Sequence, residues 1–238
     1  MTNRQMQETI METLDLKKEL VGIKVWEKEP QDIPKYEEKA FPGMCTQIGE
    51  VLQTGKTFYT VKEQHYCTGG VVATGVLPAY SREQSRKVVK MHLKMTNDYQ
   101  DLETAMQYWD DMQKRVPPIK KKNAAAQLGL FKEMDAVDLV LIFCSPGAAD
   151  ILNRSFSYVT GESVQGFGGN NGCQFSIQYP YVTGKPSSSY SDVSWRKYVG
   201  LSDEELTLSF PYKRLQECVQ RLPEVAESYR NFGAGMEI

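Results

Sequence analysis

Five cysteines are the side chains of this 238-residue sequence with the most chemical potential. Two of them, Cys67 and Cys173, follow the same order of features in the two halves of the chain: an apolar run, a Pro-Gly pair, a Thr-Gly pair and then the cysteine. The spacing from Gly55 to Cys67 is 12 residues, and the spacing from Gly161 to Cys173 is also 12. This repetition is typical of an internal duplication and makes the two cysteines equivalent.

Both cysteines are predicted to follow a short strand and to stand at the start of a helix. Unpaired amide groups and the helix dipole stabilise a thiolate at such a position. Glycines near each thiol, Gly69 and Gly70 after Cys67 and Gly169 before Cys173, allow the backbone to come close to a ligand. We therefore expect Cys67 and Cys173 to line a cofactor-binding cleft. The alternative is that both are small buried side chains that pack beside turns.

Cys45 and Cys144 are second-choice ligands. Cys45 follows a Pro-Gly pair, and Cys144 ends an apolar strand, a place where ligands often gather. With Cys67 and Cys173 they would supply four thiolates, the number that an iron–sulfur cluster or a structural zinc takes. No C-x-x-C pair is present, so four cysteines that only pack are the more common outcome of such spacings. Cys218 is expected in the core.

Other polar residues give weaker signals. His65 lies two residues before Cys67 and would share a face with it in an extended segment, as a ligand or a base. A histidine on a surface turn is the plainer interpretation. Arg196 follows Asp192 and Trp195 in a polar stretch and could bind an anionic group. No nucleophile elbow, zinc-protease or P-loop signature is present, so no enzyme class is indicated.

The elements that must position these residues alternate between helix and strand. Helices are expected at 3–18, from Pro42 to Gly55, from Cys67, through most of 81–116, at 146–160 and after Pro211. Strands are expected at 20–26, 57–61, 138–143, 163–167 and near 206, and 87–95 reads alternatively as a strand. The tail 231–238 is expected to fray.

This alternation predicts a mixed α/β (α+β) fold. We expect two duplicated lobes, related by an approximate twofold axis and packed as one domain. The first lobe would span 1–116, the connection 117–133, and the second lobe 134–238.

Composition excludes several classes of protein. Hydrophobic residues make up 41% and charged residues 24%, as in an ordinary folded chain. The net charge of −2 gives no general attraction to nucleic acid or to an anionic membrane. No apolar run approaches the length of a membrane span, and the N-terminus does not resemble a signal peptide. The odd number of irregularly spaced cysteines favours reduced thiols and a cytoplasmic protein.

Several motifs, in the same order, resemble the DUF169 family, whose function is not established. They are LVGIKVW, MCTQIGEVLQTGKTFYT and CTGG, and later DLVLIFCSP, YVTGES, TGKP and ELTLSFPYKRL. The resemblance covers about 18–222 and implies an anaerobic bacterial or archaeal setting, in which iron–sulfur or redox chemistry is more common. The resemblance also implies a further cysteine before the arginine that matches Arg196, whereas this sequence reads SSSYSD there. Either a metal site of the relatives is not shared by this chain, or Cys144 substitutes.

The sequence thus predicts a cytoplasmic protein whose cysteine-lined cleft between the lobes binds a cofactor or a metal cluster. The suspected cluster is an iron–sulfur cluster, and the expected role is redox or cofactor handling. The expected partners are a small molecule or metal cluster, with a second copy or a redox protein beside it. One alternative is a non-catalytic protein that holds a small anionic ligand through glycine-rich turns and Arg196. Another is thiol chemistry between Cys67 and Cys173, which needs sulfurs close enough to bridge.

Overall fold

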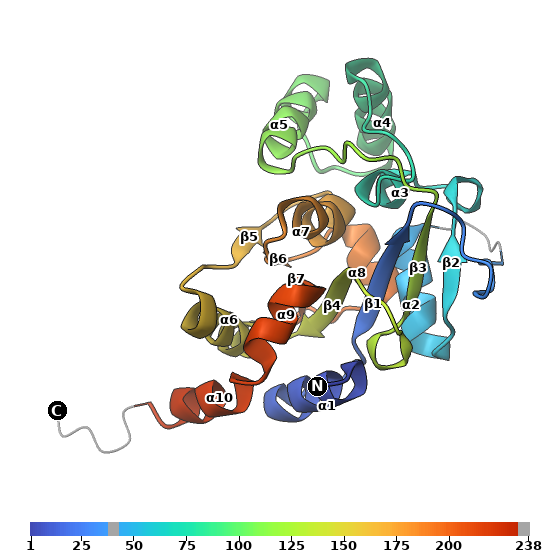
Figure 1. Ribbon diagram of the computed structural model, residues 1–238. Coiled ribbons are helices and arrows are strands. Elements are labelled where there is room, and N and C mark those ends of the chain that lie inside the picture. The colour runs from blue at the N-terminus through green and yellow to red at the C-terminus, as the bar shows by residue number, and fades with distance from the viewer. Residues whose placement is uncertain (38–42, 233–238) are drawn as a thin grey trace.

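A computed structural model of the chain describes residues 1–37 and 43–232. Within these residues the strands form one seven-stranded sheet, ordered β2-β3-β1-β4-β7-β6-β5 (Figure 1). Neighbouring strands are antiparallel except β5 and β6, which are parallel. The strands are β1 (Val21–Trp26), β2 (Phe58–Thr60), β3 (Ala125–Leu130), β4 (Leu139–Cys144), β5 (Gln165–Phe167), β6 (Ser187–Ser189) and β7 (Leu206–Pro211).

Helices cover both faces of the sheet. One face packs against α1 (Asn3–Leu14), α6 (Pro146–Thr160), α9 (Tyr212–Val219) and α10 (Leu222–Arg230), and the other against α2 (Met44–Thr54) and α8 (Val193–Val199). The central strand β4 is apolar throughout because its side chains alternate between two cores. Val140 and Ile142 enter the first core, and Leu141 and Phe143 the second.

A third layer stands at one end of the sheet (Figure 1). It contains α3 (Gly69–Ala73), α4 (Arg82–Met95) and α5 (Leu102–Arg115). Beside it, a continuous helix of residues 172–183 has a π-helical middle, Gln174–Gln178, and ends as α7 (Tyr179–Thr183). The hairpin of α4 and α5 packs Met106 and Trp109 in a small core with Phe167 and Phe175. Two 3₁₀ turns complete the set, Lys62–Gln64 and Phe131–Glu133.

The predicted fold class, mixed α/β, is confirmed, and most expected elements form where the sequence placed them. The strand alternative for 87–95 is wrong, because those residues lie in α4. The C-terminal helix divides into α9 and α10, and the sequence did not reveal β6 or α8. Pro42 and the end of the expected frayed tail, 233–238, lie outside the described residues.

The expected pair of duplicated lobes is not confirmed. Strands from both halves form a single sheet, and β3, inside the expected connection 117–133, pairs with β1 and β2. A twofold axis that exchanged the antiparallel neighbours β1 and β4 would place α2 and α6 on the same face, whereas they lie on opposite faces. The repeated sequence pattern has a local structural counterpart: Gly55 ends α2 and Gly161 ends α6, each with φ of 69°.

No helix among the described residues is long and apolar enough to cross a bilayer.

Candidate functional site

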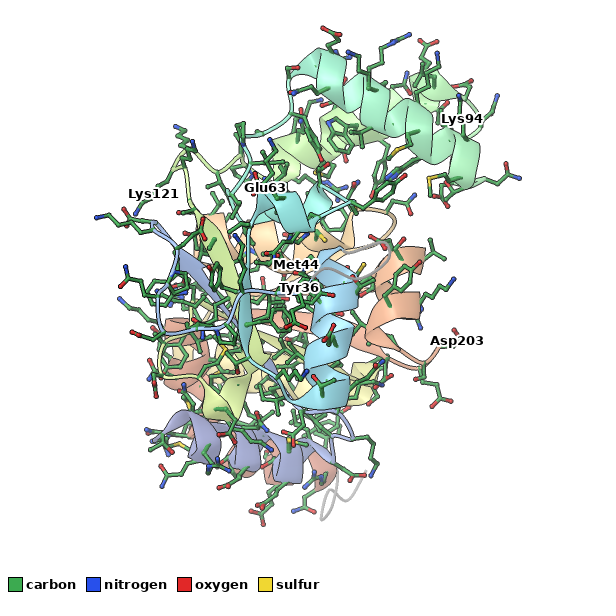
Figure 2. All side chains as sticks on the ribbon, turned by 90° about the vertical axis from the view of Figure 1, so that its right-hand side faces the viewer. Tyr36, Met44, Glu63, Lys94, Lys121 and Asp203 are labelled. Carbon is green, nitrogen blue, oxygen red and sulfur yellow. The ribbon has the colours of Figure 1, made fainter. Side chains whose placement is uncertain are left out.

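The first thiol, that of Cys45, lies on α2. This helix begins after Gly43, whose amide donates to the Thr46 hydroxyl oxygen at 2.8 Å, while that hydroxyl donates to the Gly43 carbonyl at 2.7 Å. The reciprocal cap fixes the first turn. Cys45, the second residue of the helix, is buried. Figure 2 shows its neighbour Met44 at the end of α2 that faces the third layer.

The second thiol lies beside the first. Cys67 lies in the loop that leads into α3. A Cβ atom on Gly43 would come within 3.3 Å of the Cys67 Cβ and within 3.8 Å of the Cys45 Sγ, so both cysteines border this glycine. A Cβ on Gly70 would lie 2.3 Å from the Met44 Cβ. The absence of a side chain at Gly70 therefore lets α3 approach α2 and brings Cys67 to Cys45.

The third thiol comes from the second half of the chain. Cys173 is the second residue of the 172–183 helix and is half-buried. The next side chain, Gln174, donates to the Gly69 carbonyl at 3.3 Å. A Cβ on Gly69 would lie 3.8 Å from the Cys67 Sγ and 4.0 Å from the Gln174 Nε2. The segments that carry Cys67 and Cys173 are thus joined at Gly69.

A carboxylate completes the cluster. Asp192 caps α8: its Oδ1 accepts a hydrogen bond from the Trp195 amide at 2.8 Å. Its Oδ2 accepts one from the Gly172 amide at 2.7 Å, directly before Cys173. Sequence reasoning placed Asp192 only in a polar stretch. The capping pattern was a readable signal for the helix, but the approach to the thiols depends on where the two helices lie.

The three thiols interact with one another and with this carboxylate. Burial is the main cause that raises the pKa of Cys45 to about 12, and the charges of Cys67 and Asp192 raise it further. Burial also raises the pKa of Cys173 well above its usual value, with added contributions from Cys45, Cys67 and Asp192. No cationic side chain of the described residues is among these causes. The cluster is therefore a set of soft donors in a negative environment.

The pKa shifts run against the expectation that helix N-termini stabilise thiolates here. Cys67 is exposed as a whole residue, yet protein atoms surround its sulfur closely enough that desolvation raises its pKa. The Gly69 amide lowers that pKa through a hydrogen bond, and Asp192 raises it again. Desolvation disfavours the charged form of Cys67 more than one amide favours it, so its pKa is raised on balance.

A phenol from the third layer also reaches the cluster. Tyr80 shares a hydrogen bond with the Thr68 hydroxyl, next to Cys67. Burial raises the pKa of Tyr80, and the charges of Cys67 and Cys173 raise it as well. From α5, Tyr108 donates to the Asn170 carbonyl at 2.7 Å. The α4–α5 hairpin thus contributes to the surroundings of the thiols.

Cys144 does not join the other three cysteines. It ends β4 on the face that packs against α6 and α9, whereas Cys45 belongs to the core on the opposite face. Burial raises the pKa of Cys144 to about 12, with the Glu205 charge as the second cause. The four-thiolate expectation is therefore corrected to three. Cys218 is fully buried, which confirms its predicted place in the core.

Arg196 is engaged in the backbone around it. Its guanidinium donates to the carbonyls of Tyr190 and Glu205, both at 3.0 Å, and to that of Ser202. It also lies 3.6 Å from Asp203. These contacts tie Arg196 to the backbone on both sides of α8.

The glycine-rich turn before Cys173 contains glycine where the backbone conformation requires it. Gly169 has a φ of 87°, in the left-handed region, and a Cβ there would lie 2.9 Å from the Tyr108 hydroxyl oxygen. Glycine is thus required at this position by conformation and by the nearby tyrosine. The Gly172 amide already donates to Asp192, so it is occupied within the protein.

His65 is not a surface turn residue. It is 8% exposed, and its Nε2 lies 2.8 Å from the Thr60 hydroxyl oxygen. Burial lowers the pKa of His65 to about 4, so the imidazole is neutral at physiological pH. Its Nδ1 has no hydrogen-bond partner among the described residues.

The cluster is not shaped for a single ion. Across 1–37 and 43–232, no three His, Cys, Asp or Glu side chains are grouped so that they could hold one metal ion. All five cysteines are free. The three thiols are neighbours without converging on one ion-sized point.

Comparisons with known proteins give a family and one curated relative. The family model DUF169, described as "Uncharacterised ArCR", matches residues 9–221. An uncharacterized protein of Methanocaldococcus jannaschii, MJ0308, is 25% identical over 227 residues, which cover 92% of this chain and 93% of the relative. No solved structure matches.

Proposed function

This chain belongs to the DUF169 family over residues 9–221, which include all three thiols. We propose that these three thiols form the functional site of the family region. Cys45, Cys67 and Cys173 bind a metal cluster, and the first candidate is an iron–sulfur cluster. The protein acts in redox or cofactor handling. The Gly69 and Gly70 backbone forms one wall of this site.

The observation that carries the proposal is the grouping of three thiols and a carboxylate without a cation. Side chains that raise one another's pKa destabilise their own charged forms. A bound cation removes this cost, because it displaces the thiol protons and neutralises the thiolates. Sulfur ligands favour iron–sulfur clusters, zinc and copper(I) over magnesium or calcium.

The described residues contain no group of His, Cys, Asp or Glu side chains arranged to hold a metal ion. We propose a cluster rather than a mononuclear site, because the cysteines of an iron–sulfur cluster bind different irons and surround a larger object.

The same electrostatics weigh against the small anionic ligand. The charge of Asp192 acts on all three thiols, and Arg196 already donates to three backbone carbonyls. An anion would therefore meet negative charge at the thiols. We infer a cytoplasmic setting, where thiols stay reduced, and a small molecule, a second copy or a redox protein as the partner.

The test is to measure iron and acid-labile sulfide in protein purified or reconstituted without oxygen. We expect iron and sulfide in near-equal amounts, with visible absorption. Single Cys→Ala changes at Cys45, Cys67 and Cys173 should each lower the iron content by more than about half, since each removes one ligand.

Cys144→Ala and Cys218→Ala are matched controls, because they remove buried thiols elsewhere in the fold. They should retain the wild-type iron content as long as circular dichroism shows a folded protein. Colourless, metal-free wild-type protein, or equal iron loss in the control variants, would refute the proposal.

A further inference from the structure

We propose that the outer face of α4 is a docking surface for a partner protein with an acidic face. This α4 surface consists of two neighbouring rows of exposed side chains, a basic row of Arg86, Lys90 and Lys94 and an apolar row of Met91 and Met95. The inference goes beyond the proposed function and does not depend on what the thiols bind.

Helix α4 concentrates positive charge on a chain whose net charge is −2. It contains one acidic residue, Glu83, and the basic residues Arg82, Arg86, Lys87, Lys90 and Lys94. Arg82 pairs with Asp110 and Lys87 pairs with Glu83. No salt bridge within the described part of the chain includes the three cations of the basic row.

The basic row repels itself. Residues four apart on a helix lie one above another, so Arg86, Lys90 and Lys94 follow one another along the same face. Like charges at this spacing destabilise the helix that carries them. Arg86 also borders the groove between α4 and α5, where Asp101 and Glu103 lie. An acidic surface placed along the row would remove the repulsion between its cations.

The methionines lie beside the basic row. Met91 and Met95 each follow a lysine of that row by one position, which places them about 100° further around the helix axis. Both are exposed, whereas Val89 and Leu93 pack in the core of the α4–α5 hairpin. Exposed methionine is flexible and polarizable, and it adapts to the shape of a partner. The methionines therefore offer apolar contact next to the cations.

The α4 surface is open along the helix. Helix α5 is the element that α4 packs against. Figure 1 shows α4 at the outer edge of the third layer, and Figure 2 shows it from the side, with Lys94 near its end and away from the sheet. A partner can thus lie along α4 without displacing another element.

An acidic protein fits this surface better than a nucleic acid or a membrane does. A nucleic-acid-binding domain usually has a broad excess of basic residues, whereas this chain is negative overall. A helix that lies in a membrane inserts a wide apolar face, but the apolar face of α4 is packed in the hairpin core. A protein face that combines carboxylates with an apolar side chain complements both rows.

The test uses a fluorescently labelled amphipathic peptide of glutamate and leucine, whose binding is followed by anisotropy at low and at physiological salt. The wild type should bind it, and more weakly as salt rises. Lys90→Glu/Lys94→Glu should weaken binding at least about tenfold, because two attractions become repulsions. Met91→Ser/Met95→Ser should weaken binding of this peptide about threefold but leave that of a leucine-free glutamate peptide unchanged.

Lys120→Glu/Lys122→Glu is the matched control, because it makes the same change of charge at two other exposed lysines. Figure 2 shows Lys121, which lies between them, at the opposite edge of the molecule from Lys94. The control should change the affinity by less than about twofold. An equal loss in the control, or no salt-dependent binding to the wild type, overturns the inference.

Two further comparisons complete the test. Phosphatidylserine vesicles or duplex DNA that bind the wild type more tightly than the peptide does would also overturn the inference. Lys90→Glu/Lys94→Glu, once circular dichroism shows that it is folded, should bind a peptide of lysine and leucine more tightly than the wild type does. Failure of this reversal contradicts an electrostatic docking surface on α4. The iron content of the protein enters none of these outcomes, so the proposed function is tested separately.

Discussion

At the scale of single residues, the main finding is that three neighbouring thiols lie in surroundings that raise their pKa. Reactive cysteines are commonly activated by a nearby cation or helix N-terminus, which lowers the pKa. Here burial and a carboxylate raise it instead at Cys45, Cys67 and Cys173. Thiols with a raised pKa are poor nucleophiles at neutral pH, because the thiolate is the form that reacts.

This environment predicts how Cys67 reacts with iodoacetamide in metal-free protein. Asp192→Asn removes a charge that raises the Cys67 pKa, so the thiolate fraction at pH 8 should rise. Because the thiolate is the form that reacts, the rate of Cys67 modification should rise with it. Peptide mapping by mass spectrometry gives the rate at each cysteine. The control is Asp101→Asn, because Asp101 also caps a helix, α5, by accepting from the Thr104 amide at 2.8 Å. An unchanged Cys67 rate, or an equal increase in the control, would contradict the placement of Asp192 beside Cys67.

A second residue-scale prediction concerns His65 and acid stability. Its folded-state pKa is about 4, against 6.5 for the free side chain, because burial disfavours the imidazolium. Between these values the unfolded chain binds the proton and the folded chain does not, so stability is lost as pH falls from about 6.5 to about 4. Urea unfolding of His65→Gln should show about 2 kcal/mol less loss between pH 7 and pH 5 than the wild type. Parallel losses in the two proteins would be inconsistent with a buried neutral imidazole.

At the scale of elements, the thiol cluster depends on close contacts between helices. A Cβ on Gly49, inside α2, would lie 2.0 Å from the Tyr198 carbonyl oxygen of α8. Helix α8 is the element that Asp192 caps, and α2 carries Cys45. Because Gly49 has no side chain, α2 with Cys45 can pack closely against α8, at whose start Asp192 lies.

Gly49→Ala should accordingly lower the free energy of unfolding by about 3 kcal/mol, since backbone cannot yield as a flexible side chain can. Gly147→Ala is the matched control. Gly147 also lies in a helix, α6, but the nearest atom to its added Cβ, the Ser145 Oγ, is 4.0 Å away. That change should be neutral or stabilising by up to about 1 kcal/mol. Chemical denaturation of both variants measures the difference, and equal stabilities would show that α2 and α8 can separate freely.

Sequence could predict the elements because their signals are local. The apolar run of β4 and the Thr-Gly ends of α2 and α6 were readable directly, and the repeated spacing pointed to Cys67 and Cys173. The prediction that Cys144 joins the other thiols is wrong because successive residues of a strand point to opposite faces of the sheet. Phe143 and Cys144 accordingly belong to different cores. Asp192 was missed because its approach to the thiols depends on strand order.

At the scale of the whole molecule, the α4–α5 hairpin is the part least tied to the central sheet. Figure 1 shows both helices standing above the sheet, beyond α3. Their small core contains Val89 and Trp109 and meets the rest through Phe167 and Phe175. Met91 and Met95 of α4 are exposed at 44% and 71%. A helix with so little buried apolar surface gains little stability from the rest of the fold.

Native-state hydrogen exchange should therefore show the amides of α4 exchanging at least about 100-fold faster than those of β4, which is buried along its whole length. Addition of iron and sulfide should slow exchange around Tyr80 if a bound cluster fixes the third layer. Uniform exchange across α4 and β4 would indicate that the hairpin unfolds only with the whole protein.

The order in which the ribosome makes the chain limits when this site can exist. Cys45 and Cys67 emerge early, but Cys173 and Asp192 follow only after β3 and β4 have been made. The three thiols and the carboxylate of Asp192 can therefore come together only after synthesis has passed residue 192. Any chain that ends before this residue lacks part of the cluster.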